Sequence, residues 1–143
     1  MDDLHNRAGS LDVIELHGNI QRVKCTTSCG KVETWEETSE VPVCPTCGAL
    51  LRPDVVWFGE QLPREALERA VEEARSYDIF FSIGTSGLVQ PAATLAYAAK
   101  NRGALIVEVN LEPISLSGKV DFGLYCKAGE ILPSLVQIVW LRN

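Results

Sequence analysis

Short apolar runs separated by amphipathic segments dominate the chain from residue 53 onward. Runs rich in Val, Ile, Leu and Phe predict strands at residues 54–58, 79–83, 104–109 and 120–126. Apolar residues with helical spacing predict helices at residues 63–75, 91–102 and 131–141. The run at 79–83 is nearly continuous, which is typical of a strand buried on both faces. This alternation predicts an α/β fold, with a parallel, Rossmann-like sheet and helices on both of its faces.

The part of the chain before residue 53 has a different pattern. Residues 12–16 predict one further strand, which ends at His17. Residues 22–52 are polar and rich in threonine, so we interpret them as a small domain inserted into the sheet-forming chain. The predicted organisation is a Rossmann-like domain made of residues 1–21 and 53–143, with an inserted domain made of residues 22–52.

Four of the five cysteines fall in this insertion, as two short-spaced pairs. Cys25 and Cys29 form a C-x3-C pair, and Cys44 and Cys47 follow as a C-x2-C pair. Two such pairs on separate turns can place four thiolates around one zinc ion at about 2.3 Å, in a closed site that is structural rather than catalytic. Two disulfides or four buried thiols are the alternatives. We expect Cys126, which lies in an apolar stretch, to be a buried and unreactive thiol.

Composition and charge narrow the function classes. The 143 residues are 46% hydrophobic with a formal net charge of -6, which is ordinary for a globular domain and unfavourable for a nucleic-acid surface. The sequence has no run of about 18 uncharged apolar residues, and its first residues do not resemble a signal peptide. We therefore expect a cytoplasmic protein without membrane or nucleic-acid partners, in a reducing compartment that favours zinc over disulfides.

Glycines and polar residues follow nearly every predicted strand. Ligands of parallel sheets bind beyond the carboxyl ends of the strands. The residues expected at this edge are 17–19, 58–60, 84–86, 110–112 and 128–129. Thr85 and Ser86 could bind an anion near the start of the next helix, and Asn110 and Glu112 could hold ribose hydroxyls, so the set favours a nucleotide site. Each turn alone could also be an ordinary connection, which needs Gly, Ser and Asn.

His17 is the candidate acid–base residue. It follows the predicted strand 12–16 at the ligand edge and precedes a glycine. A neutral imidazole in that position can accept a proton from a hydroxyl group. A surface or capping histidine is the alternative.

Together these motifs resemble those of the sirtuins, the NAD-dependent protein-lysine deacylases. The resemblance extends over essentially the whole chain and rests on the four cysteines and on residues 2–5, 8–10, 15–19, 51–60, 84–86 and 109–113. The Val-Val-Trp-Phe-Gly-Glu run is similar to that of the bacterial, deacylase-type branch. The family implies transfer of an acyl group from a lysine side chain to ADP-ribose, with release of nicotinamide.

The resemblance also implies roles for individual residues. His17 corresponds to the catalytic base, and the four cysteines correspond to the ligands of a structural zinc. Contacts with NAD are implied for Asp2, Gly84, Thr85, Ser86, Asn110, Leu111, Glu112 and Ala128. Contacts with an acyl-lysine peptide, which would pair with the loop as an added strand, are implied for Val56, Phe58, Gly59 and Glu60. NAD and zinc are the implied cofactors, and acyl-lysine proteins are the implied partners.

One departure from the family pattern changes the expectation for this chain. Sirtuins begin with a strand and a Gly-rich phosphate loop, and neither precedes Asp2 here. Met1 stands where the family has Val or Ile, which a GTG start codon would explain, so we expect a truncated gene or gene model. We expect such a chain to bind NAD poorly and not to turn over alone. The alternative function is a non-catalytic, zinc-stabilised interaction module.

Overall fold

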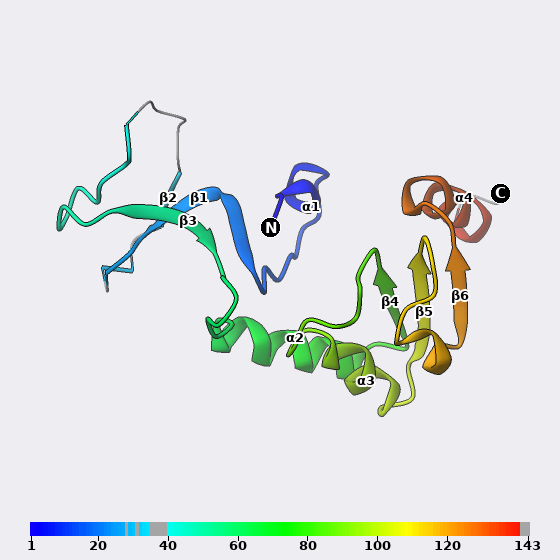
Figure 1. Cartoon of the computed structure of the whole chain (residues 1–143). Coiled ribbons are helices and arrows are strands. Elements are labelled where there is room, and N and C mark those ends of the chain that lie inside the picture. Colours follow the sequence, from blue (N-terminus) through cyan, green and yellow to red (C-terminus); the bar gives the residue numbers. More distant parts are fainter. Residues whose placement is uncertain (28, 31, 35–39, 141–143) are drawn as a thin grey trace. The chain divides into compact units, whose positions relative to one another are not determined.

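The computed structural model describes residues 1–27, 29–30, 32–34 and 40–140 (Figure 1). It divides into two compact units, Met1–Leu67 and Glu68–Asn143, and each contains its own three-stranded sheet. Residues 28, 31 and 35–39 of the predicted insertion, and residue 141 of the last predicted helix, lie outside the described residues. The predicted domain boundaries near residues 21 and 52 stay a prediction.

The first unit is built on an antiparallel sheet. Its strands are β1 (Gly18–Cys25), β2 (Val32–Thr34) and β3 (Leu51–Val55), and they lie in the order β2-β1-β3. In the pairing of β1 with β3, Gly18 lies opposite Val55 and Cys25 lies opposite Leu51. The cysteine-bearing turns therefore lie at one end of the sheet, and residue 17 lies at the other.

A short helix, α1 (Leu4–Arg7), precedes this sheet. The Ile20 N–H donates a 2.8 Å hydrogen bond to the Met1 carbonyl oxygen. This bond holds the first residues of the chain beside the start of β1.

The prediction of a strand at residues 12–16 is wrong. Residues 12–15 are irregular, residues 16–17 form a turn, and the strand begins only at Gly18. The Leu16 N–H donates to the Ile14 carbonyl at 3.1 Å, and the Gly18 N–H donates to the Glu15 carbonyl at 3.2 Å. These local bonds use backbone groups that a strand needs for hydrogen bonds to a neighbouring strand. Ile14 and Leu16 are therefore half-buried but do not pair in a sheet. The strand predicted at 54–58 also lies earlier, as β3, and pairs in the antiparallel sheet.

The second unit contains the parallel sheet that the alternating pattern predicts. Strands β4 (Ile79–Ile83), β5 (Leu105–Asn110) and β6 (Phe122–Tyr125) lie in the order β4-β5-β6, and both pairs are parallel. Helix α3 (Thr94–Lys100) connects β4 to β5, the 3-10 turn η1 (Ser117–Lys119) precedes β6, and α4 (Ala128–Trp140) follows β6. The segments that follow the three strands therefore start at one common edge.

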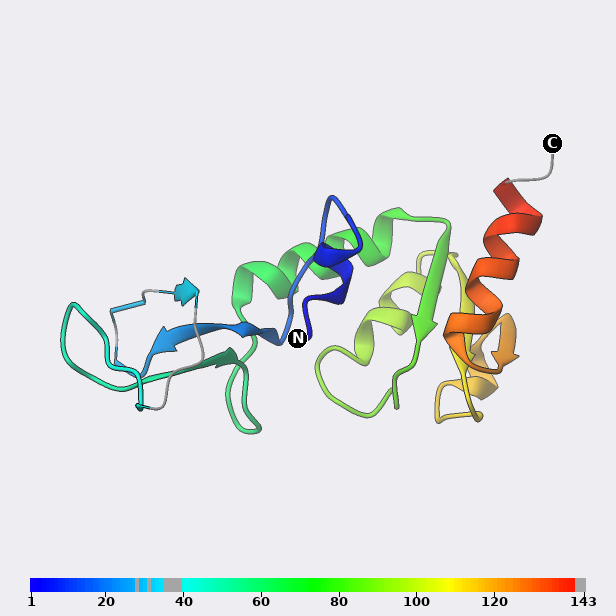
Figure 2. The same ribbon diagram turned by 90° about the horizontal axis from the view of Figure 1, so that it is seen from above.

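The helices agree with the sequence pattern to different degrees. Helix α2 (Arg64–Ser76), the long green helix of Figure 2, matches the prediction to within one residue at each end. Helix α3 starts three residues later than predicted, because the Thr94 N–H and hydroxyl both donate to the Pro91 carbonyl, at 2.9 and 2.7 Å, in a preceding turn. Within the described residues, no helix has the length and apolar character to cross a bilayer.

Small side chains make up much of the core of the second unit. Ala99 of α3 and Ile106 of β5 are fully buried, and Ala74 of α2 and Ala96 belong to the same cluster. Alanines let a helix backbone approach the sheet closely, so α3 packs on one face of β4 and β5.

The expectation that β4 is buried on both faces is wrong. Ile79, Phe81 and Ile83 alternate along the strand and are 52%, 38% and 42% exposed. Ser82, on the opposite face, is 7% exposed. Strand β4 is the edge of its sheet, and only the face toward α3 is covered among the described residues.

Candidate functional site

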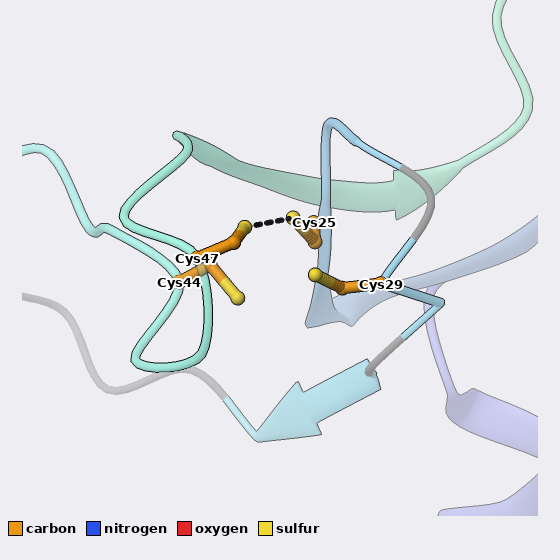
Figure 3. Close-up of side chains that lie close together, drawn as sticks. All are labelled: Cys25, Cys29, Cys44 and Cys47. Carbon is orange, nitrogen blue, oxygen red and sulfur yellow. Dashed lines mark hydrogen bonds between the residues drawn. The ribbon is translucent and has the colours of Figure 1, made fainter.

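The four paired cysteines converge at the end of β1 (Figure 3). Cys25 ends β1, Cys29 lies in the following turn, and Cys44 and Cys47 lie in the turn before β3. All four sulfur atoms lie within 4.8 Å of one another, and the Cys25 and Cys47 sulfurs are 3.6 Å apart. Sulfurs at the corners of a zinc tetrahedron are about 3.8 Å apart, so this donor set fits zinc. No disulfide joins the cysteines, and Cys126 is half-buried rather than buried as expected.

A threonine that the sequence reading did not select lies among these sulfurs. The Thr27 Oγ1 is 3.1 Å from the Cys25 sulfur, 3.4 Å from the Cys47 sulfur and 4.0 Å from the Cys29 sulfur. A hydrogen bond from its hydroxyl and, to a smaller degree, one from the Ala49 backbone N–H lower the pKa of Cys47 to about 6. The neighbouring Cys47 sulfur raises the pKa of Cys29 to about 11. Adjacent thiolates repel each other, so a cation is needed for the whole set to ionise together.

His17 lies in a tight turn at the other end of the sheet. It is half-buried, and its carbonyl oxygen accepts a 3.2 Å hydrogen bond from the Val56 N–H. The next residue, Gly18, has a φ of 71°, and a Cβ there would lie 2.0 Å from the Asp54 carbonyl oxygen. Only glycine fits this crossing, so the turn fixes the backbone of His17 against the start of the loop after β3.

Two asparagines and two carboxylates connect this turn with α1. The Asn19 side chain is buried, and its amide nitrogen donates to Asp3 Oδ1 at 2.7 Å and to Glu15 Oε1 at 2.8 Å. The Asn6 amide nitrogen donates to the same two oxygens, at 2.8 and 3.2 Å. The residues that flank His17 are therefore connected to α1, and Asp2 lies next to this network with its carboxylate accepting the Leu4 N–H at 3.1 Å.

An arginine completes this network from the middle of β1. Arg22 Nη2 donates to Glu15 Oε2 at 2.6 Å and to Asp54 Oδ2 at 3.1 Å. Hydrogen bonds from Asn19 and Arg22 outweigh partial burial, and they lower the pKa of Glu15. Glu15 is therefore an anion at neutral pH, and the network holds it in one geometry. In the sequence, Asn19 was visible only as a turn residue, and no local signal pointed to Arg22.

The loop that follows β3 carries the four predicted peptide contacts. Phe58 is 99% exposed, and Gly59 turns the chain with a φ of 89°. Val56 is half-buried beside the His17 turn. Glu60 has both carboxylate oxygens engaged inside the loop, by the Arg52 guanidinium at 2.6 Å and by the Trp57 N–H at 3.1 Å.

The predicted cofactor residues of the second unit gather at the carboxyl edge of its sheet. Gly84, with a φ of 60°, directs its N–H to the Val109 carbonyl at 2.9 Å. The Asn110 amide nitrogen donates to the Thr85 carbonyl at 2.7 Å, while its Oδ1 accepts the Leu111 N–H at 3.1 Å. The Asn110 amide thus joins the turns after β4 and β5, whereas the sequence reading assigned it to ribose hydroxyls.

The remaining residues of this edge are open to ligand. The Thr85 and Ser86 hydroxyl oxygens accept the backbone N–H groups of residues 87 and 88, at 3.2 and 3.4 Å. Leu111 and Glu112 are exposed, and Ala128 is half-buried at the first position of α4. Glycine turns, hydroxyls and a carboxylate along one edge form a surface that suits a phosphate and a ribose.

Comparisons with known proteins agree with this geometry. The model of the Sir2 family matches residues 1–91. The "NAD-dependent protein deacylase" of Pyrococcus furiosus is 51% identical over 145 residues, and the alignment covers 96% of this chain and 58% of the relative. "NAD-dependent protein deacylase 2" of Pyrobaculum aerophilum is 49% identical, with 99% and 57% covered. The chain thus spans a little over half the length of the curated relatives it matches.

Solved structures give the same answer. A crystal structure of a Sir2 homolog–NAD complex has a TM-score of 0.91 and 45% identity, covering 96% of this chain and 54% of that chain. A structure described as Sir2–p53 peptide–NAD+ has a TM-score of 0.86 and 34% identity, covering 95% and 59%. These likenesses support the Rossmann-like α/β fold that the sequence predicts.

Proposed function

Because this chain belongs to the Sir2 family, we propose that its residues serve NAD-dependent protein-lysine deacylation and that, as its sequence predicts, the chain alone binds NAD poorly and does not turn over. In this proposal the acyl group of a lysine side chain moves to ADP-ribose, and nicotinamide is released. Acyl-lysine proteins are its substrates, and the cytoplasm, where thiols stay reduced, is its location.

One observation carries the proposal, namely the joined edge of the second unit. The turns after β4 and β5 are connected by the Asn110 side chain at 2.7 Å from the Thr85 carbonyl. This leaves the Gly84 turn, the two hydroxyls of the 85–86 turn and the exposed Glu112 along one edge. Such an edge is where α/β sheets bind nucleotides, so we assign the phosphates and riboses of NAD to it.

His17 is the proposed general base. When bound, NAD supplies the ribose that accepts the acyl group and the nicotinamide that leaves. The imidazole of His17 would accept a proton from a ribose hydroxyl of the bound NAD. A positioned base of this kind contributes roughly 10²–10⁴-fold to rate. Asp2, beside α1, is assigned to the nicotinamide carboxamide.

The other elements of the first unit have supporting roles. Zinc would be held by Cys25, Cys29, Cys44 and Cys47, and four thiolates leave no open coordination position, so the metal stabilises the turns rather than taking part in chemistry. The loop 56–60 is assigned to the peptide that carries the acyl-lysine. Its exposed Phe58 supplies apolar surface for the lysine stem.

Ligand titrations followed by ¹⁵N NMR test the proposal even if affinity is low. ADP-ribose is expected to shift the amides of residues 84–86, 110–112 and 128, and an acetyl-lysine peptide is expected to shift those of 56–59. Any nicotinamide that the chain releases from NAD with this peptide should fall by at least roughly 100-fold in His17→Ala. His5→Ala is the matched control, and it should leave the release unchanged.

The opposite result is equally clear. If zinc binds one per chain but neither ligand shifts any amide at these positions, the chain is a zinc-stabilised interaction module. Nicotinamide release that survives His17→Ala would overturn the role of His17 alone.

A further inference from the structure

A single guanidinium contacts both the end of β3 and the loop that follows it. Arg52, in β3, donates from Nη1 to the Val55 carbonyl at 3.0 Å and from Nη2 to Glu60 Oε1 at 2.6 Å. Its Cζ also lies 4.6 Å from the centroid of the Trp57 ring. The guanidinium therefore holds the residue before the loop, Trp57 within it and its last residue at once.

Glu60 closes the loop through two further hydrogen bonds. Its second oxygen accepts the Trp57 N–H at 3.1 Å, and its own N–H donates to the Trp57 carbonyl at 3.0 Å. The hydrogen bond from the Trp57 N–H and, to a smaller degree, the one from the Arg52 guanidinium lower the pKa of Glu60. Both oxygens are used within the loop, so this carboxylate acts on the loop itself.

These contacts leave the apolar tip of the loop uncovered. Phe58 is 99% exposed although Trp57 and Glu60 are held in place. Fixing a loop in advance removes part of the ordering cost that binding otherwise carries. The other side of the loop contacts the His17 carbonyl through the Val56 N–H at 3.2 Å, so the fixed segment reaches the proposed base.

We propose that Arg52 and Glu60 are positioning residues that hold the Val56–Glu60 loop in the shape that receives the acyl-lysine peptide. The inference rests on the proposed function of this loop, and it changes the role of Glu60 from a substrate contact to an internal clamp. Lysine cannot replace Arg52, because an ammonium is a point donor that cannot bond two acceptors in a fixed fork and stack on an indole as well.

Peptide binding by variants of the whole chain tests the proposal. Arg52→Lys and Glu60→Gln should each weaken the binding of an acetyl-lysine peptide by roughly tenfold, measured by NMR titration, with ADP-ribose binding unchanged. In a double-mutant cycle their effects should be less than additive, because both break one clamp. Arg102→Lys, in the exposed turn after α3, is the matched control and should bind the peptide like the wild type.

A structural readout separates loop positioning from folding. In the wild type, the Trp57 amide shift should follow the titration of Glu60, and Arg52→Lys should move that titration upward while zinc content and melting temperature stay unchanged. Phe58→Ala should weaken peptide binding and leave the Trp57 amide shift unchanged.

The outcomes separate the positioning role of Arg52 from the proposed function of the loop. If the wild type binds the peptide and Arg52→Lys binds it equally well, the positioning role is wrong and the proposed function stands. If the wild type shows no peptide shift at 56–59, the proposed function of the loop is wrong, and the positioning role is wrong with it.

Discussion

The side-chain amide of Asn110 donates a 2.7 Å hydrogen bond to the carbonyl oxygen of Thr85. It crosses from the end of β5 to the turn after β4, and the Gly84 N–H reinforces this connection by donating to the Val109 carbonyl at 2.9 Å. Two turns that are 25 residues apart in sequence are therefore held together by hydrogen bonds. The geometry of the proposed nucleotide edge depends on this bond.

Replacing the Asn110 amide should loosen this edge. Asn110→Asp places a carboxylate against the Thr85 carbonyl oxygen, so repulsion replaces attraction, and Asn110→Ala only removes the bond. We expect Asn110→Ala to cost about 1 kcal/mol of unfolding free energy and Asn110→Asp to cost more, with ADP-ribose shifts at 84–86 weakened in both. Urea unfolding and NMR titration measure the two effects. ADP-ribose shifts at 84–86 that stay unchanged in Asn110→Asp would show that the Asn110 amide does not hold this edge in place.

Gly18 should be the least replaceable glycine of the first unit. A Cβ there would lie 2.0 Å from the Asp54 carbonyl oxygen, at a φ of 71°. We expect Gly18→Ala to cost at least about 3 kcal/mol, because strand β1 must move away from β3. Gly9→Ala is the control, since its φ of 86° carries backbone strain of about 1 kcal/mol but no atom lies within 4 Å of the added Cβ. Equal losses in the two variants, measured by thermal unfolding, would show that the contact with Asp54 is unimportant.

The sequence predicts best those features that depend on neighbours along the chain. The helical spacing of Ala70 and Ala74 placed α2 correctly, and the apolar run at 79–83 marked β4 with correct ends. The cysteine spacing likewise identified a donor set whose sulfurs lie together. Local periodicity and pair spacing are sufficient for such elements.

Features that depend on distant partners were missed. The strand of this region is β1, after residue 17, and not the predicted 12–16, because it pairs with residues of β3 that lie 26 to 37 positions away along the chain. Asn19 looked like a turn residue until its contacts with Asp3 and Glu15 were seen. Nor can the sequence show that the two oxygens of Glu60 are already occupied.

The cysteine cluster should bind one zinc ion per chain, and its loss should unfold the turns it connects. Cys44, which is 2% exposed, is the ligand to change. Cys44→Ser replaces a thiolate with a weak hydroxyl ligand, so we expect zinc measured by elemental analysis to fall well below one per chain. The melting temperature of the first unit should fall with it, and a strong chelator should have the same effect on the wild type.

Cys126→Ser is the matched control for this change. Cys126 lies outside the cluster, after β6, so the variant should keep its full zinc content. A loss of zinc in Cys126→Ser, or full zinc in Cys44→Ser, would contradict the assignment of the four ligands.

Asp121 should give the second unit a stability that depends on pH. Its Oδ2 accepts the Ile106 N–H at 2.8 Å, and its Oδ1 lies 3.5 Å from the Lys100 ammonium. The Ile106 N–H, followed by Lys100, lowers the pKa of Asp121 in the folded chain. The unfolded chain binds the proton more readily, so the stabilisation is complete above the unfolded pKa of about 3.9 and is lost as pH falls through the lower, folded pKa.

Asp121→Asn should therefore be less stable than the wild type at pH 7, and this difference in stability, the gap, should close toward pH 2. Urea midpoints across this range measure the gap. Lys100→Met should produce a smaller gap, because Lys100 is the weaker and more exposed of the two partners. A gap that stays constant from pH 7 to pH 2 would mean that the charge on Asp121 does not stabilise the fold.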